Sequence, residues 1–174
     1  KFPRNPGITK FLLKKYNLKM PGGWYGSFLR GRSINDEWIA MQDHLNFLKT
    51  VNSDVFIFAD VSGSIQSYQS RKLSTRPKMD NEEFIKYCKK INEISNRLHY
   101  EGIPMSYHGH MGTIIQTQDD IDRFMDNTNE NTFLLYDTGH LLFAQVDYER
   151  LLKDYVSKIN HVHCKDIRKN ILEN

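Results

Sequence analysis

The chain has 174 residues, of which 39% are hydrophobic and 26% are charged, and its formal net charge is +3. These values are typical of a globular domain with one core, so we expect residues 1–174 to form a single domain without nucleic-acid partners or membrane-spanning segments. Two cysteines are too few for a disulfide framework, which favours a cytoplasmic location.

Helical and strand patterns alternate along the chain. In order, they predict a helix at 8–16, a strand at 18–24, a helix at 34–48, a strand at 55–61, a loop at 62–80, a helix at 84–98, a strand at 104–110, a helix at 119–125, a strand at 133–138, a helix at 151–156 and a strand at 161–165. Such alternation indicates an α/β fold with a parallel sheet. A flavodoxin-like open sheet and a (β/α)8 barrel both fit this pattern.

The loop at 62–80 is the longest stretch without a helix or strand pattern. It carries Arg71, Lys72, Arg76 and Lys78. Loops of this length in compact domains often cover or bind a ligand, although a solvated loop with scattered charges fits equally well.

Polar side chains gather where the predicted strands end, which is where parallel α/β folds place their active sites. His108, Asp137 and His163 are 29 and then 26 residues apart, close to one strand-helix unit. We therefore expect them at equivalent positions on adjacent strands, roughly 5 Å apart. Two imidazoles and a carboxylate suit Mn²⁺, Fe²⁺, Co²⁺ or Zn²⁺, so the spacing predicts a metal site.

Several runs of sequence occur together in an order that is known from one enzyme superfamily. They are 1–4, 23–25, 61–66, 76–77, 107–113, 137–140 and 161–168. Through them the chain resembles, over essentially its whole length, the xylose-isomerase-like TIM barrels and more narrowly the inosose dehydratases. The resemblance implies a (β/α)8 TIM barrel that is incomplete here, with about strands 3 to 7. The eighth strand, which supplies a metal-binding Glu in such barrels, would be absent.

The resemblance also implies a reaction and a substrate. A hydro-lyase of inositol catabolism would remove water from 2-keto-myo-inositol, a small cyclic polyol ketone, by taking the proton next to the ketone and then expelling a hydroxyl. A divalent metal would stabilise the enolate, and a general acid would protonate the leaving hydroxyl. The family implies Mn²⁺ or Co²⁺ and glutathione, although the residues themselves give no reason for glutathione.

Site roles follow from the resemblance and from position along the chain. The metal ligands would be His108, Asp137 and His163. The candidates for acid–base chemistry or for contacts to reacting oxygens are His110, His140 and Lys165. The candidates for substrate binding are Trp24, Asp60 and Arg168.

Other functions remain open at this stage. A sugar isomerase or epimerase of the same superfamily would use the same metal but return the proton to a neighbouring carbon. A repair endonuclease would need more metal ligands and a basic surface. A flavodoxin-like binding module or an inactive barrel fragment is the non-enzyme alternative. A fragment would expose two strand edges, which invite aggregation or pairing with another chain, such as a second copy in a homo-oligomer, and we expect the isolated chain to be poorly active.

Overall fold

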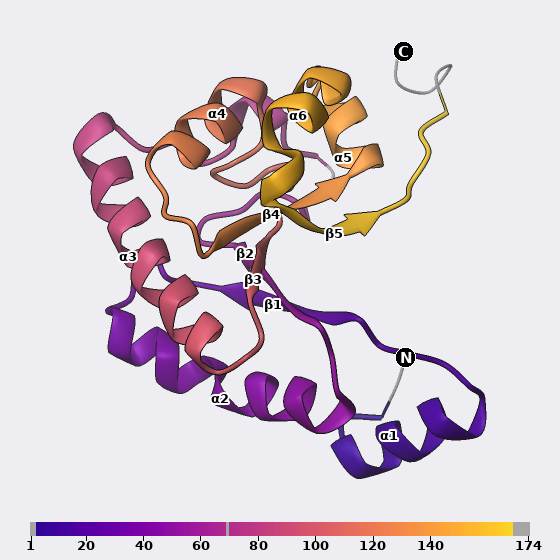
Figure 1. Ribbon diagram of the computed structural model, residues 1–174. Helices are drawn as coiled ribbons and strands as arrows, with labels where there is room; N and C mark the ends of the chain where they lie inside the picture. The colour runs from indigo at the N-terminus through magenta and orange to yellow at the C-terminus, as the bar shows by residue number, and fades with distance from the viewer. Residues whose placement is uncertain (1–2, 69, 169–174) are drawn as a thin grey trace.

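A parallel sheet covered by helices forms the structure, a computed structural model that describes residues 3–68 and 70–168 (Figure 1). The strands are β1 (Gly22–Ser27), β2 (Val55–Asp60), β3 (Met105–Tyr107), β4 (Thr132–Asp137) and β5 (Ile159–His163). The helices are α1 (Pro6–Lys15), α2 (Ile34–Val51), α3 (Asn81–Tyr100), α4 (Gln118–Asp126), α5 (Thr138–Phe143) and α6 (Tyr148–Tyr155), with short 3₁₀ helices η1 (Leu73–Thr75) and η2 (Val156–Lys158).

The strand order selects between the two architectures that the sequence left open. The strands lie in the order β1-β2-β3-β4-β5, and each pairs in parallel with the next. A flavodoxin-like sheet would have the order 2-1-3-4-5, whereas consecutive neighbours are the arrangement of a TIM barrel. The prediction of an α/β barrel is confirmed, and the described residues supply five of the eight strands that closure requires.

Side chains at the helix starts explain where several helices begin. Asp80, Thr117 and Asp147 each accept a hydrogen bond from the backbone N–H three residues later and so act as N-caps. Gly102 follows α3 with a φ of 77°, a conformation that glycine adopts without strain. No helix among the described residues has both the length and the apolar character needed to cross a membrane.

Both faces of the sheet are apolar around β2, whose residues are all buried. Phe56 and Phe58 belong to the large cluster between the sheet and the helices, and Figure 1 shows α2 and α3 along that side. Val55 and Ile57 point the other way and form a smaller cluster with Leu135. Burial on two faces explains why this strand is a continuous apolar run rather than an alternating one.

The first strand lies later in the chain than the sequence predicts, at Gly22–Ser27 rather than 18–24. Glycines are usually depleted in strands, so a pair of them gives little sign of a strand start. Here their lack of a side chain is required. A Cβ at Gly22 would lie 2.9 Å from Val55 Cγ2, and a Cβ at Gly23 would lie 2.9 Å from Leu48 Cδ2.

Several smaller expectations are corrected by the structure. β3 is shorter than predicted, because the chain leaves the sheet soon after the His108 N–H donates to the Phe58 carbonyl. The loop at 62–80 contains the short helix η1. The last strand, predicted at 161–165, ends at His163, so Cys164 lies beyond it and is exposed, whereas Cys88 is buried. Helix α5, which starts immediately after β4, was not predicted at all.

Burial predicts how two matched isoleucines contribute to stability. Ile91 on α3 is completely buried, whereas Ile39 on α2 is 71% exposed. We expect Ile91→Ala to lower the free energy of unfolding by about 2–5 kcal/mol, because it leaves a cavity. Ile39→Ala should change it by less than about 0.5 kcal/mol. Urea denaturation of the two variants measures both values, and equal losses would contradict the packing described above.

Candidate active site

The carboxylate of Asp137 is the centre of the site. Asp137 is the last residue of β4, and α5 begins at the next residue without an intervening loop. Oδ1 accepts a hydrogen bond from the His140 backbone N–H at 3.1 Å and so caps α5. Oδ2 lies 3.3 Å from His108 Nε2 and 3.1 Å from His163 Nδ1, and it also accepts a hydrogen bond from Lys165 Nζ. One oxygen therefore organises the helix while the other gathers nitrogen atoms from the adjacent strand ends.

Asp137 keeps its negative charge although its side chain is only 2% exposed. Burial opposes ionisation, but hydrogen bonds involving His108, Lys165 and the His140 backbone outweigh it and hold the pKa of Asp137 well below its usual range. A buried carboxylate of this kind requires positive charge close by. Lys165 Nζ supplies one such charge.

The hydrogen bonding of His108 indicates which ring nitrogen faces the carboxylate as a ligand. Nδ1 lies 2.8 Å from the Gly109 carbonyl, which can only accept, so Nδ1 carries the proton. Nε2 can then donate to Asp137 Oδ2 only in the protonated ring, whereas in the neutral ring that a metal would bind, Nε2 has a lone pair that faces Asp137 Oδ2. Two lone pairs facing each other are satisfied by a shared cation, so this pair of donors fits a divalent metal ion.

His140 lies in the same cluster as these two residues. One ligand atom each from His108, Asp137 and His140 lie within 4.8 Å of one another. Burial and the adjacent His110 ring lower the pKa of His140 to about 3, and burial also lowers the pKa of His110. Both imidazoles are therefore neutral near pH 7. Their ring centroids are 3.9 Å apart.

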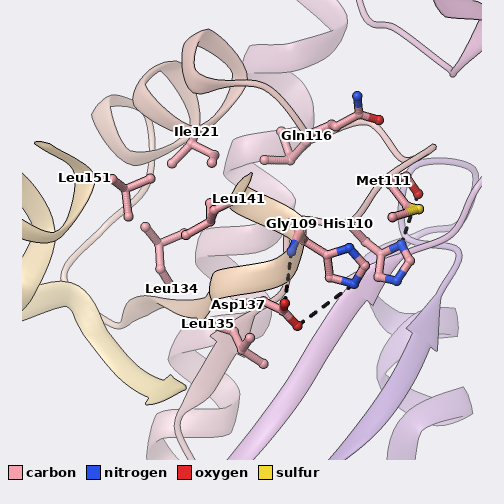
Figure 2. Close-up of a pocket in the computed structure, with 12 residues that line it drawn as sticks. Gly109, His110, Met111, Gln116, Ile121, Leu134, Leu135, Asp137, Leu141 and Leu151 are labelled. Carbon is pink, nitrogen blue, oxygen red and sulfur yellow. Dashed lines mark hydrogen bonds and ion pairs between the residues drawn. The ribbon is translucent and has the colours of Figure 1, made fainter. Parts of the chain in front are cut away.

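A pocket beside Asp137 has a polar side and an apolar side. Figure 2 shows Asp137 and His110 on one side of it and Leu134, Leu141 and Leu151 on the other. The leucines come from β4, α5 and α6. Apolar walls lower the local dielectric constant and so strengthen the electrostatic interactions of the carboxylate with the groups that face it.

Close contact between α5 and the segment after β5 brings Lys165 to Asp137. The Lys165 backbone N–H donates to Thr138 Oγ1 at 2.8 Å. A Cβ at Gly139 would lie 2.7 Å from the Lys165 Cβ, so only glycine lets the two backbones approach this closely. The two residues after Asp137 therefore set the position of the lysine.

Trp24 lies beside the imidazoles, at the open edge of β1. Its ring contacts those of His108 and His110 edge to face, with centroids 5.2 and 5.6 Å apart. It is 41% exposed, so part of the indole ring remains free to contact a ligand. This position suits the predicted role of Trp24 in substrate binding.

The other two predicted substrate contacts have different surroundings. Asp60 is 2% exposed, and its two oxygens accept hydrogen bonds from the backbone N–H groups of Arg30, at 2.9 Å, and Ser62, at 2.8 Å. It therefore fastens the loops after β1 and β2 to each other. Arg168 is exposed beyond the end of β5. Their substrate-binding roles remain predictions.

The structure groups most of the residues that the sequence singled out. The residues that meet at the carboxyl ends of the strands are Trp24, His108, His110, Asp137, His140, His163 and Lys165. Sequence reasoning gave His140 an acid–base role but missed its proximity to the other ligand atoms. Its position three residues after a strand-end aspartate, in the first turn of a helix, is the signal that would have shown it.

Comparison with known proteins gives one family and several relatives. A family model described as xylose isomerase-like TIM barrel matches residues 10–173. The chain is 33% identical over 172 residues to a rhizopine catabolism protein of Rhizobium meliloti, covering 99% of this chain and 53% of that protein. It is 31% identical over 175 residues to an inosose dehydratase of Clostridium perfringens, covering 99% and 59%.

A solved structure shows the same fold at low sequence identity. The probable 3-DHS dehydratase of Bacillus anthracis matches with a TM-score of 0.70 and 13% identity, over 92% of this chain and 55% of that chain. The chain thus spans between half and two thirds of the length of these relatives and of this structure.

Acidification should destabilise the metal-free chain through His140. Its pKa is about 3 when folded, whereas an unfolded imidazole titrates near 6.5, so between these values the unfolded chain binds more protons. We expect His140 alone to lower the free energy of unfolding by about 1.4 kcal/mol for each pH unit below 6.5. Urea denaturation with a chelator present, from about pH 7 to about pH 5, measures this slope.

The control separates His140 from the other titrating groups. His140→Gln should make the pH dependence shallower by about one proton, whereas Asn46→Gln, at an exposed position on α2 without a titrating group, should leave it unchanged. The assignment would be wrong if both variants kept the slope of the unmodified chain.

Proposed function

Because the chain belongs to the xylose isomerase-like TIM barrel family, we propose that the protein is a metal-dependent dehydratase that removes water from 2-keto-myo-inositol. Relatives named inosose dehydratase support the substrate and the reaction class. The observation that carries the proposal is the convergence of His108, His163 and Lys165 on one oxygen of Asp137.

The donor set fits a divalent cation, since the free lone pair of His108 Nε2 faces a carboxylate oxygen. We assign the cation to His108, Asp137 and His163, and His140 Nε2, at 3.9 Å from Asp137 Oδ2, is close enough to contribute. A mixed set of imidazole and carboxylate donors suits Mn²⁺ or Co²⁺. When bound, the cation supplies a Lewis acid that stabilises negative charge on the ketone oxygen.

The protein's own groups supply the proton transfers. His110 Nδ1 lies 3.0 Å from the Met111 carbonyl and therefore carries the proton, which leaves Nε2 free to accept one. A neutral imidazole at this position can take the proton from the carbon next to the ketone. The electron pair of the resulting enolate then forms the carbon–carbon double bond and breaks the bond to the β-hydroxyl, which leaves as water as the protonated imidazole returns a proton to it.

Lys165 and Trp24 would hold the substrate. The Lys165 side chain is 47% exposed, so its ammonium group can donate to a substrate oxygen as well as to Asp137. Trp24 presents the exposed part of its ring next to the imidazoles and can pack against the carbon ring of a polyol. Positioning of this kind supports the reaction by reducing the freedom of the bound substrate.

Metal content tests the ligand assignment. We expect His108→Ala, Asp137→Asn and His163→Ala each to weaken Mn²⁺ binding by at least about tenfold, measured by equilibrium dialysis and elemental analysis. Asparagine is chosen at 137 because it keeps an oxygen to cap α5. His99→Ala on the exposed face of α3 is the control and should bind metal as the unmodified chain does. Unchanged binding in all three variants would disprove the assignment.

Product analysis tests the reaction. With Mn²⁺ and 2-keto-myo-inositol, we expect the protein to form a dione that absorbs in the ultraviolet, and His110→Gln to lower kcat by about a hundredfold or more. His99→Gln should have the activity of the unmodified protein. An isomeric ketone without this absorbance would instead establish the isomerase or epimerase alternative.

A further inference from the structure

Arg76 links the two loops that follow β2 and β3. Although it belongs to the long loop at 62–80, its side chain is only 7% exposed. Nη1 donates to the carbonyls of Thr113, at 3.1 Å, and Ile114, at 2.8 Å, and Nη2 donates to Asp120 Oδ2 at 2.6 Å. The guanidinium thus binds two carbonyls on the loop after β3 and a carboxylate at the start of α4, a task that suits its planar array of donors.

The segment that Arg76 binds also holds the backbone of His110. The His110 N–H donates to the Ile115 carbonyl at 3.1 Å, and the His110 carbonyl accepts from Thr113 Oγ1 at 2.7 Å. Both backbone groups of His110 are therefore fixed by residues 113–115. The position of this segment accordingly sets where the His110 ring lies against His140.

Asp120 completes the network at the start of α4. Besides Arg76, its Oδ2 accepts from the backbone N–H groups of Gln116, at 3.1 Å, and Thr117, at 2.8 Å. Arg76 thus binds the loop after β3 at residues 113 and 114, and Asp120 binds the same loop at residues 116 and 117. Largely buried ion pairs contribute little net stability, and their best-attested use is to fix one arrangement among several.

We infer that Arg76 is a positioning residue. By binding the carbonyls of Thr113 and Ile114, it holds the His110 ring in its place beside the His140 ring. The consequence for turnover rests on the proposed function, whereas the consequence for the loop does not. Arg76→Lys is the informative change, because lysine keeps the charge but cannot serve three acceptors in a fixed plane. Arg123→Lys is the matched control, since Arg123 lies on α4 over the ring of Phe84.

Amide hydrogen exchange tests the placement without any reaction. In Arg76→Lys we expect the His110 amide to exchange at least about tenfold faster, because its acceptor segment is released. The His108 amide, which donates to Phe58 in the sheet, should be unaffected and reports that the fold persists. Thr113→Val, which removes the hydroxyl bonded to His110, should resemble Arg76→Lys. An unchanged His110 amide in both variants would overturn the inference.

Coupling to His110 tests the role in turnover. Arg76→Lys should lower kcat by about tenfold or more with KM nearly unchanged, and should add less than about twofold in a His110→Gln background. A merely structural role would instead give the full loss in both backgrounds and would overturn the inference, as would an equal effect of Arg123→Lys. If the unmodified protein fails to dehydrate the ketone, the proposed function fails, while the exchange comparison still decides the positioning role.

Discussion

The buried negative charge of Asp137 is the constraint on which the site depends. A carboxylate removed from water must be compensated by donors or cations in contact with it. Here the compensation comes from the ends of β3 and β5 and from the first turn of α5. The parallel arrangement makes this convergence available, because adjacent strands deliver their last residues to the same edge of the sheet.

Buried charges also fasten the loops around this edge. Asp60 joins the loops after β1 and β2 through two backbone N–H groups. Arg76 joins the loops after β2 and β3 through two carbonyls. Asp60 ends β2 and Arg76 lies in the loop that follows, and at either position an apolar side chain would leave backbone polar atoms without these partners, which costs stability when they are buried. The loops at the carboxyl ends of the strands are therefore joined to their neighbours by hydrogen bonds from buried charged side chains.

Sequence alone could predict the core of the site because its geometry follows from spacing. Asp137 pairs directly with His163 in the β4–β5 register, so a separation of one strand-helix unit becomes a direct neighbour contact. The start of β1 could not be predicted, because Gly22 and Gly23 are required by side chains on β2 and α2 that are distant in the chain. Helix α5 has six residues, too few to show a helical period. The contacts of Arg76 could not be predicted, since its partners lie 37 to 44 residues away in the chain.

The shared use of Asp137 has a consequence for the dynamics of α5. Because Oδ1 caps the helix while Oδ2 faces the nitrogen cluster, any movement of the Asp137 carboxylate changes the contacts of both. Any ion or molecule that binds the cluster therefore stabilises α5 by the same free energy, and anything that unravels α5 weakens that binding equally. Binding at the nitrogen cluster around Asp137 and order in α5 are thermodynamically linked.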